Sequence, residues 1–239
     1  MIRVEHLYKS FNRQEVLKDI NVDIAEGELL VILGESGSGK SVLLKNMIGL
    51  FKPDQGCVRI NGEDITRMSE RQLLGVRKKI GYLFQEGALY DFMNCYDNIA
   101  FPLREHTDFK EKVIREKIER ILKLIDLEDV ENKFPSELSG GMKKRVALAR
   151  AICLDSKILF CDEPTSGLDP IRSRDISDLI RNVSKKLGCT TVVTSHDLPN
   201  SFRIADRCLI LRNGAVVATG TPKEIQESDN ATVREFTLN

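Results

Sequence analysis

The chain has 239 residues, of which 41% are hydrophobic, so it can bury the core of one sizeable α/β domain. Lysine and arginine together number 36, as do aspartate and glutamate, and the formal net charge is zero. This balance excludes a strong overall field that would attract nucleic acid or an anionic surface, and we expect no nucleic-acid partner.

Cysteine usage and hydropathy indicate in which cellular compartment the protein works. The six cysteines are scattered, contain no C-x-x-C pair and lie mostly in apolar runs, which predicts reduced core residues in a cytosolic protein. A metal site or a disulfide framework is the alternative. Residues 1–10 lack the apolar core of a signal peptide, and no stretch approaches the roughly 20 apolar residues of a membrane span. Any membrane role is therefore expected to be peripheral.

Residues 3–26 alternate in polarity and include many β-branched types, with breaks at 12–14 and 25–27. This pattern predicts antiparallel strands ahead of the first strongly apolar run. Two aromatic residues of this region, Tyr8 and Phe11, stand out. Either ring can stack on an adenine or fill the core, and the spacing alone favours the core.

A glycine-rich stretch separates the apolar run Leu29–Leu33 from Val42–Leu50, which has helical apolar spacing. Between a strand and a helix, glycines let N–H groups turn inward and the helix adds its positive dipole end, which predicts a polyphosphate-binding loop. Lys40 can reach the terminal phosphates, and the Ser41 hydroxyl can ligate Mg²⁺. A flexible turn, the alternative, needs neither the Lys-Ser pair nor the buried strand. The expected ligand-binding residues are Gly34, Glu35, Ser36, Gly37, Ser38, Gly39, Lys40, Ser41 and Val42.

The following elements lead to a second polar strand end. Residues 57–60 predict a strand that turns at an Asn-Gly pair, and Ser69 opens a short helix. Ile80–Phe84 is a further apolar strand, and it ends on Gln85. A glutamine at the carboxyl end of a buried strand can reach a magnesium ion or an attacking water, or it can simply cap a loop. The strand alone leaves both interpretations open.

The middle of the chain is helical in pattern, and we expect a helical subdomain at about 87–155, inserted into a single domain that spans 1–239. Residues 110–130 predict one charged helix that packs through an apolar face. Before it, residues 87–104 concentrate apolar and aromatic side chains with few charges. This stretch is either subdomain core or an exposed surface for a partner.

Two further segments carry candidate functional groups. Ser139, Gly140 and Gly141 begin an amphipathic helix, where N–H groups and a hydroxyl offer a second anion site; the alternative is a simple serine N-cap. Asp162 and Glu163 end a buried strand. The first can hold Mg²⁺ and the second can polarise an attacking water, whereas the alternative is an acidic turn.

His196 follows another β-branched strand, at 190–195, and a hairpin at 208–218 and a helix from Pro222 come after it. A lone histidine after a strand is usually structural. Here, however, the phosphate loop, Gln85, the acidic pair and His196 all follow strands. Parallel sheets bind ligands outside the carboxyl ends of their strands, so this coincidence supports one triphosphate site.

The complete set of motifs resembles the ATP-binding cassette (ABC) ATPases, and the resemblance covers nearly the whole chain. The motifs stand in the order of that family: Walker A at 34–41, the Q-loop at Gln85, the signature at 138–142, Walker B at 158–162 followed by Glu163, the D-loop at 166–169 and the H-loop at His196. The resemblance implies an α/β fold: a P-loop NTPase core with an N-terminal antiparallel β subdomain and an inserted helical subdomain.

The same resemblance implies ATP hydrolysis with Mg²⁺. It implies a homodimer in which the signature residues contact the ATP of the opposite subunit, and it places Phe11 at the adenine-stacking position, against the preference from spacing. The implied catalytic residues are Glu163, His196, Lys40 and Gln85, the implied metal ligands are Ser41, Gln85 and Asp162, and the implied signature contacts are Ser139, Gly140 and Gly141.

One subgroup of the family fits best. Residues 84–90, 97–107 and 140–145 and the ending 233–236 resemble the MlaF-like ATPases of the bacterial maintenance-of-lipid-asymmetry system, and Met142, where the family ordinarily has glutamine, fits this subgroup. The resemblance implies phospholipid transport between inner and outer membranes, on the cytoplasmic face of the inner membrane. It implies an MlaE-like integral membrane permease, a small cytoplasmic regulatory subunit and a periplasmic Mce-domain protein as partners.

Other functions of the family are alternatives. The chain can energise import or export of another substrate, or it can be a non-transport ABC ATPase. Chromosome-structuring members separate Walker A from the signature by a long coiled coil, for which this chain has too few residues and no sustained heptads. Translation-associated members usually carry two cassettes in one chain, and this chain has one set of motifs.

Overall fold

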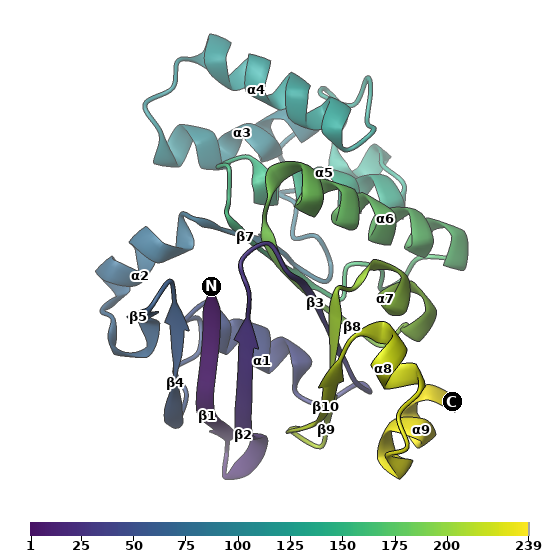
Figure 1. Ribbon diagram of the computed structural model, residues 1–239. Coiled ribbons are helices and arrows are strands. Elements are labelled where there is room, and N and C mark those ends of the chain that lie inside the picture. Colours follow the sequence, from purple (N-terminus) through teal and green to yellow (C-terminus); the bar gives the residue numbers. More distant parts are fainter. Residues whose placement is uncertain (239) are drawn as a thin grey trace. The chain divides into compact units, whose positions relative to one another are not determined.

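The structure, a computed structural model, describes the backbone of residues 1–238 and the side chains of residues 1–236. The chain forms two compact units, and Figure 1 labels most of their helices and strands. The first unit combines Met1–Arg77 with Thr190–Asn239, and the second is Lys78–Cys189. The first unit is therefore built from two stretches that are distant in sequence.

An antiparallel sheet of the first unit confirms the strands expected from the alternation at 3–26. One of its faces is apolar, and Leu7 and Leu17 are fully buried. Asn61 and Gly62 take positive φ angles of 53° and 85° and close the predicted turn. The strands, in their order across the sheet, are β2 (Gln14–Ile24), β1 (Ile2–Phe11), β4 (Gln55–Ile60) and β5 (Glu63–Asp64).

The same unit contains the strand that leads to the phosphate loop. All five residues of β3 (Leu29–Leu33) are buried, as expected for a parallel strand covered on both faces. β3 runs parallel to both β8 (Thr190–Ser195) and β9 (Arg207–Arg212), and β9 forms the predicted hairpin with β10 (Ala215–Gly220). Leu33 pairs with Ser195, so β3 and β8 end at the same edge of the sheet.

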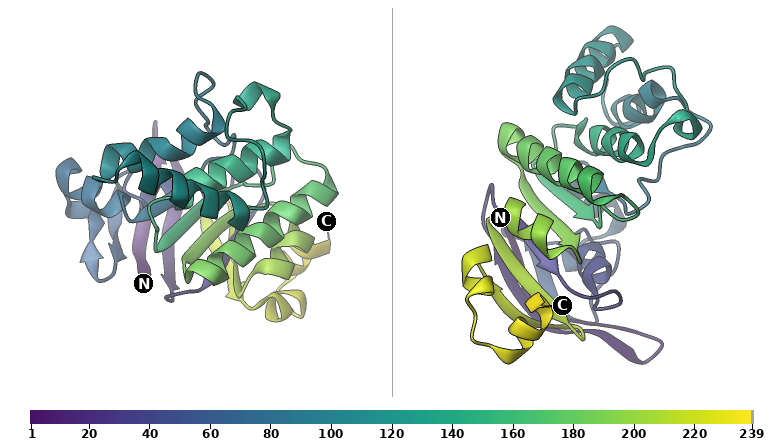
Figure 2. Two further views of the ribbon diagram at one scale, coloured as in Figure 1. Left: turned by 90° about the horizontal axis from the view of Figure 1, so that it is seen from above. Right: turned by 90° about the vertical axis from the view of Figure 1, so that its right-hand side faces the viewer.

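Short helices complete the first unit. α1 begins directly after the glycine-rich loop, and the Ser69 hydroxyl accepts the N–H of Gln72 at 3.4 Å, so Ser69 opens α2 as predicted. α8 and α9 lie against β10 (Figure 2). The helices are α1 (Lys40–Met47), the 3-10 turn η1 (Ile65–Arg67), α2 (Glu70–Arg77), α7 (Leu198–Ile204), α8 (Pro222–Gln226) and α9 (Ala231–Leu238).

In the second unit, helices pack with a pair of parallel strands. α3, α4 and α5 pack on one another, and α5 also contacts β6 and α6. The expectation of an inserted helical subdomain at about 87–155 stays a prediction. The elements are β6 (Ile80–Leu83), α3 (Cys95–His106), α4 (Glu111–Leu124), the 3-10 turn η2 (Pro135–Glu137), α5 (Gly140–Ile152), β7 (Ile158–Asp162) and α6 (Pro170–Leu187).

The prediction of one helix over 110–130 is wrong at its carboxyl end, because α4 ends at Leu124. Asp126 takes a left-handed φ of 52°, and the N–H of Leu127 bonds back to the carbonyl of Leu122 at 3.0 Å. This bond is typical of a helix C-terminus. Leu127 and Val130 are buried even though they lie beyond the helix, so the apolar spacing continues past the point where the backbone turns away.

No helix within residues 1–238 is long and apolar enough to cross a membrane. All six cysteines are free thiols, and all but Cys57 are buried.

Candidate functional site

The phosphate loop follows β3 and needs glycine at particular positions. A Cβ atom on Gly34 would lie 2.4 Å from the carbonyl oxygen of Leu211 and 2.5 Å from Ser38 Oγ. Gly37 and Gly39 have φ angles of 80° and 106°, which side chains disfavour. The sequence pattern is therefore a packing requirement at Gly34 and a backbone requirement at the two later glycines.

Lys40 closes this loop from inside. Its side chain is only 4% exposed, and its Nζ donates to the carbonyls of Gly34 at 2.8 Å and of Glu35 at 3.0 Å. Among the described residues, Ser38 Oγ is buried without a hydrogen-bond partner, and the first turn of α1 holds no acidic residue. An ammonium group, a buried hydroxyl and a helix N-terminus together fit a bound polyphosphate.

The same unit brings His196 to the start of this loop. His196 directly follows β8, the parallel neighbour of β3. Gly34, Glu35 and His196 all line a cavity of about 180 Å³, to which Arg212 and Glu235 also contribute. Arg212 pairs with Glu235 of α9 at 2.7 Å. The structure thus places two of the predicted strand ends at one location.

The remaining candidate of the first unit is Phe11, at the end of β1. Its side chain is 39% exposed, and its ring meets that of Phe51 edge-on at 5.2 Å between centroids. Lys9 Nζ lies 5.2 Å from the centre of the Phe11 ring. The ring is accessible to a flat ligand, and its role in adenine stacking stays a prediction.

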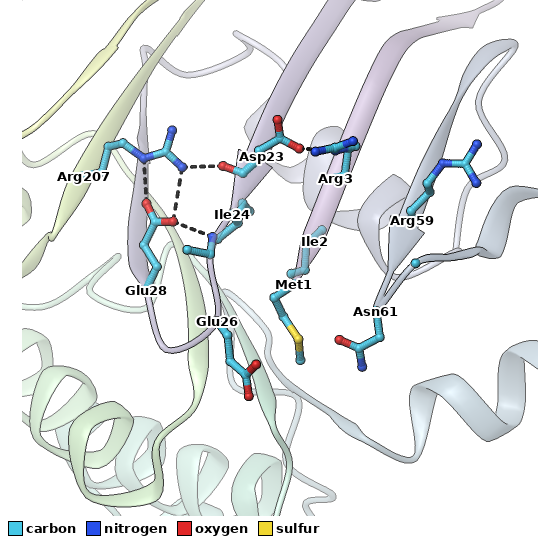
Figure 3. A pocket seen from close by; sticks show the side chains of 12 residues that line it. Met1, Ile2, Arg3, Asp23, Ile24, Glu26, Glu28, Arg59, Asn61 and Arg207 are labelled. Carbon is cyan, nitrogen blue, oxygen red and sulfur yellow. Dashed lines mark hydrogen bonds and ion pairs between the residues drawn. The ribbon is translucent and has the colours of Figure 1, made fainter.

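A larger cavity of the first unit, about 670 Å³, lies at the opposite end of β3 (Figure 3). Glu28, which precedes β3, pairs with Arg207 at 2.6 Å, and Asp23 pairs with Arg3 at 2.5 Å. These arginines are held by carboxylates of the same wall, and no phosphate-binding motif lies there. Ligands of parallel sheets bind at the carboxyl ends of strands, so the glycine loop is the better candidate for a polyphosphate site than this cavity.

In the second unit, Asp162 and Glu163 end β7. Asp162 is buried, and the hydroxyl of Tyr82 on the neighbouring strand β6 donates to its Oδ2 at 3.1 Å. Burial raises the pKa of Tyr82, and the negative charge of Asp162 raises it further. Tyr82 therefore stays a hydrogen-bond donor that fixes the Asp162 carboxylate. Glu163 takes a left-handed φ of 42° and so turns the chain directly after the strand.

Gln85 connects this strand end with two other segments. Its side-chain Nε2 donates to Ser166 Oγ in the predicted D-loop at 3.3 Å. Its main-chain oxygen accepts a hydrogen bond from Lys144 Nζ on α5. The structure thus brings the Q-loop, the D-loop and the helix of the signature together within the second unit.

The signature residues stand at the start of α5. Ser139 is the N-cap, and its Oγ accepts the N–H of Met142 at 3.4 Å. A Cβ atom on Gly140 would lie 3.2 Å from a methyl group of Leu168 in the D-loop. The N-cap interpretation and the anion-site interpretation are compatible, because the helix N-terminus supplies N–H groups in both.

Two residues of this cluster escape prediction from the sequence, Tyr82 and Lys144. A signal exists for each. Tyr82 lies two residues before Phe84, and this spacing places both rings on the same face of the chain. In the structure the two ring centroids lie 4.5 Å apart. Lys144 lies three and four residues before Ala147 and Leu148, so helical spacing places a lysine on the buried face of α5.

Comparison with known proteins agrees with the family that the sequence motifs predict. The family model described as ABC transporter matches residues 17–166, which is more than half of the chain. The chain belongs to this family and is an ATP-binding cassette ATPase. Its cofactors are ATP and the Mg²⁺ that accompanies ATP in this class of enzyme.

Two relatives and one solved structure are similar to this chain over most of its length. The chain is 44% identical to the probable ribonucleotide transport ATP-binding protein mkl of Mycobacterium leprae, over 98% of this chain and 68% of that protein. It is 39% identical to the intermembrane phospholipid transport system ATP-binding protein MlaF of Haemophilus influenzae, over 99% of this chain and 89% of that protein. The dimeric post-hydrolysis structure of the ATP-binding cassette MJ0796 with ADP and Pi covers 93% of this chain and 99% of its own, with a TM-score of 0.85 and 31% identity.

Proposed function

We propose that the chain is the ATP-hydrolysing subunit of a transporter that moves phospholipid between the inner and outer membranes through a separate permease. The observation that carries this proposal is similarity to MlaF over 99% of the chain. In this role the protein works on the cytoplasmic face of the inner membrane, with an MlaE-like permease, a small regulatory subunit and a periplasmic Mce-domain protein as partners. The mkl relative, named for ribonucleotide transport, supports nucleotide as the competing cargo.

The proposed roles of the polar residues divide between phosphate binding, metal binding and activation of the attacking water. Bound Mg²⁺ would neutralise charge on the β- and γ-phosphate oxygens. Lys40 binds the terminal phosphates, Glu163 polarises the attacking water, and His196 contacts the terminal phosphate. Ser41, Gln85 and Asp162 would hold the metal ion, the remaining residues of 34–42 would cradle the phosphates, and Phe11 would stack on adenine.

We further propose a homodimer in which each signature meets the ATP of the other subunit. Support comes from the MJ0796 cassette, whose post-hydrolysis structure is dimeric. In the Glu163→Gln protein, ATP is expected to drive dimer formation, and adding Ser139→Arg is expected to abolish it by steric and charge conflict. Sedimentation velocity with and without ATP measures this, and ATP-dependent dimers of the Ser139→Arg protein would exclude the arrangement.

The proposed permease contact lies between β6 and α3. Phe92 is 76% exposed and its ring lies 5.6 Å from that of Tyr90, which is also exposed. Leu89 and Met93 are half-buried beside them, whereas Tyr96 is buried. An exposed aromatic patch next to the Q-loop fits a surface that receives a helix of a membrane protein.

The deciding experiment reconstitutes the chain with the permease of its own source in vesicles. Purified complex is analysed for bound lipid by mass spectrometry, and ATP-dependent transfer is measured with labelled phospholipid and, separately, with labelled ribonucleotide. Phospholipid in the complex and phospholipid transfer support the proposal; nucleotide transfer without lipid transfer overturns it.

The permease contact is tested separately. Leu89→Asp and Phe92→Asp are expected to prevent co-purification of permease while ATP binding persists, and permease capture by both variants would exclude this surface.

A further inference from the structure

A lysine buried on the signature helix has no part in the division of labour above. Lys144 lies on the inner face of α5 and is only 7% exposed. Lysine is rarely buried to this extent, because removing an ammonium group from water is costly unless other groups replace the lost hydration. The neighbours of Lys144 therefore indicate why a charge is kept at this position.

The main-chain partner of Lys144 is the Q-loop. Its Nζ donates to the carbonyl oxygen of Gln85, two residues beyond β6. Arg150 of the same helix donates to the carbonyl of Gly87, two residues after Gln85 in the loop, at 2.7 Å. A Cβ atom on Gly87 would meet the Ala147 methyl group at 3.4 Å, so the loop lies directly on α5. Two cations about one and two-thirds turns apart on α5 thus hold the carbonyls of Gln85 and Gly87 in one loop.

The charge partners of Lys144 distinguish it from Arg150. Burial lowers the pKa of Lys144, and the charges of Glu86 and Glu163 oppose this shift by favouring the ammonium form. Burial also lowers the pKa of Arg150, but there Tyr90 and Cys153 are the opposing groups. Of these two cations, Lys144 is therefore the one whose charge interacts with the carboxylate that follows β7.

We propose that Lys144 is a positioning residue for ATP hydrolysis: it fixes the Q-loop main chain at Gln85, and from there its positive charge interacts with Glu163. The inference rests on the proposed role of Glu163. Lys144 touches no phosphate in this scheme. It acts through two other residues, one that holds the metal ion through its side chain and one that polarises the water, and so it couples the signature helix to the reacting groups.

The test is Lys144→Met, which keeps the length of the side chain and removes its charge and hydrogen bonds. We expect kcat for ATP to fall about 10-fold or more while KM changes less than about 3-fold, because the phosphates are held by the loop at 34–41. The melting temperature is expected to stay equal or to rise, since an apolar isostere often replaces a buried charge without loss of stability. A purely structural role predicts the reverse, a lower melting temperature with kcat per folded molecule unchanged.

Three comparisons make the result specific. Lys144→Arg keeps the charge and is expected to restore part of kcat. Arg150→Met removes the other buried cation of this face, and because it lies beside Tyr90 rather than Glu163 its effect on kcat is expected to be smaller than that of Lys144→Met. In single-turnover experiments, Lys144→Met is expected to slow the Glu163→Gln protein far less than it slows the wild-type protein, because the charge has lost its partner.

The outcomes separate this inference from the proposal beneath it. Normal turnover by Glu163→Gln would overturn the assignment of the water-polarising base. Loss of hydrolysis in Glu163→Gln together with wild-type kcat in Lys144→Met overturns only the role of Lys144. Equal fractional losses from Lys144→Met in the wild-type and Glu163→Gln backgrounds do so as well, because they show that the two residues act independently.

Discussion

The phosphate loop and the cluster around Gln85 are built in opposite ways. The loop consists of consecutive residues, and its lysine bonds to carbonyls five and six residues earlier in the chain. The cluster joins three separate segments: Tyr82 and Gln85 at the end of β6, Lys144 on α5, and the run from Asp162 at the end of β7 to Ser166. A site made of neighbours in sequence can be derived from the sequence, whereas a site made of distant segments depends on packing that only the fold defines.

The difference extends to how each site is held in place. In the loop, backbone geometry carries the shape, through a φ of 106° at Gly39 and the close approach of Leu211 to Gly34. In the cluster, side-chain contacts carry it, through the hydroxyl of the half-buried Tyr82 and the ammonium of the buried Lys144. We therefore expect substitutions in the loop to affect nucleotide binding and substitutions in the cluster to affect the chemical step.

The largest effect is expected for Glu163→Gln. The amide keeps the shape of the carboxylate but cannot polarise the attacking water, so hydrolysis should fall by at least about 100-fold. ATP binding should stay close to the wild-type value, because this residue does not hold the phosphates. A coupled ATPase assay and equilibrium binding of labelled ATP measure the two quantities. If binding fell as far as hydrolysis, the distinction between loop and cluster would break down.

The second effect concerns Lys40 in the loop. Lys40→Ala removes the ammonium that faces the phosphates and also the two bonds to the carbonyls of Gly34 and Glu35. We expect ATP affinity to fall by at least about 10-fold. Lys45→Ala, a lysine in the last turn of the same helix, is the matched control and should bind nearly as the wild type does. Unchanged ATP affinity in Lys40→Ala would show that the loop does not depend on its lysine.

Prediction from sequence succeeds where the signal is local. The buried strand Leu29–Leu33 and the hairpin at 208–218 follow from spacing and turn residues, and the structure confirms them. At Ser139 the structure shows the N-cap that was the alternative interpretation, and the anion site stays a prediction. It fails at the end of α4, because the apolar residues Leu127 and Val130 keep a buried pattern after Asp126 has turned the backbone. Phe11 shows a further limit, since spacing favoured the core although its ring is 39% exposed.

The contacts of Tyr82 and Lys144 lie beyond such rules. Their partners Asp162 and Gln85 stand 80 and 59 residues away in the chain. Alternation and helical spacing place each side chain on a face, but they do not say which carboxylate or carbonyl that face will meet. The roles of Asp162 and Glu163 were therefore suggested by two carboxylates at a strand end, and family resemblance decided the role of Gln85. The contacts that Tyr82 and Lys144 make with these segments were not predicted.

A smaller effect is expected for Tyr82→Phe, which removes only the hydroxyl that bonds to Asp162. Loss of one buried hydrogen bond should cost about 1 kcal/mol of folding free energy. Because Asp162 is a proposed magnesium ligand, the Mg²⁺ concentration for half-maximal ATPase activity should rise about 2-fold to 5-fold. Tyr96→Phe removes a bond to Glu111 at 2.7 Å and is the matched control. It should lower stability without changing the Mg²⁺ requirement, and an equal Mg²⁺ shift in both variants would contradict the role of Tyr82.

The smallest effect concerns charges that water reaches. Glu111 at the start of α4 bonds to Arg104 at 2.7 Å and to Tyr96, and these partners lower its pKa from the ordinary 4.5 to about 2. A folded-state pKa below the unfolded value means that the stabilisation is present above about pH 4.5 and is lost as the pH falls towards 2. Because the Glu111 side chain is 52% exposed, solvent screening should reduce the contribution to less than about 1 kcal/mol.

Glu111→Gln should therefore lower the melting temperature near pH 6 by no more than about 4 °C, and the gap to the wild type should close as the pH falls through this window. Glu116→Gln, on the exposed face of the same helix, is the charge-matched control and should show no such pH-dependent gap. Added salt should shrink the Glu111 effect, because the ion pair is open to screening, but should leave the kcat loss of Lys144→Met nearly unchanged, because Lys144 is buried. Equal salt sensitivity of the two effects would show that burial does not separate the charges of the cluster from those of the helical surface.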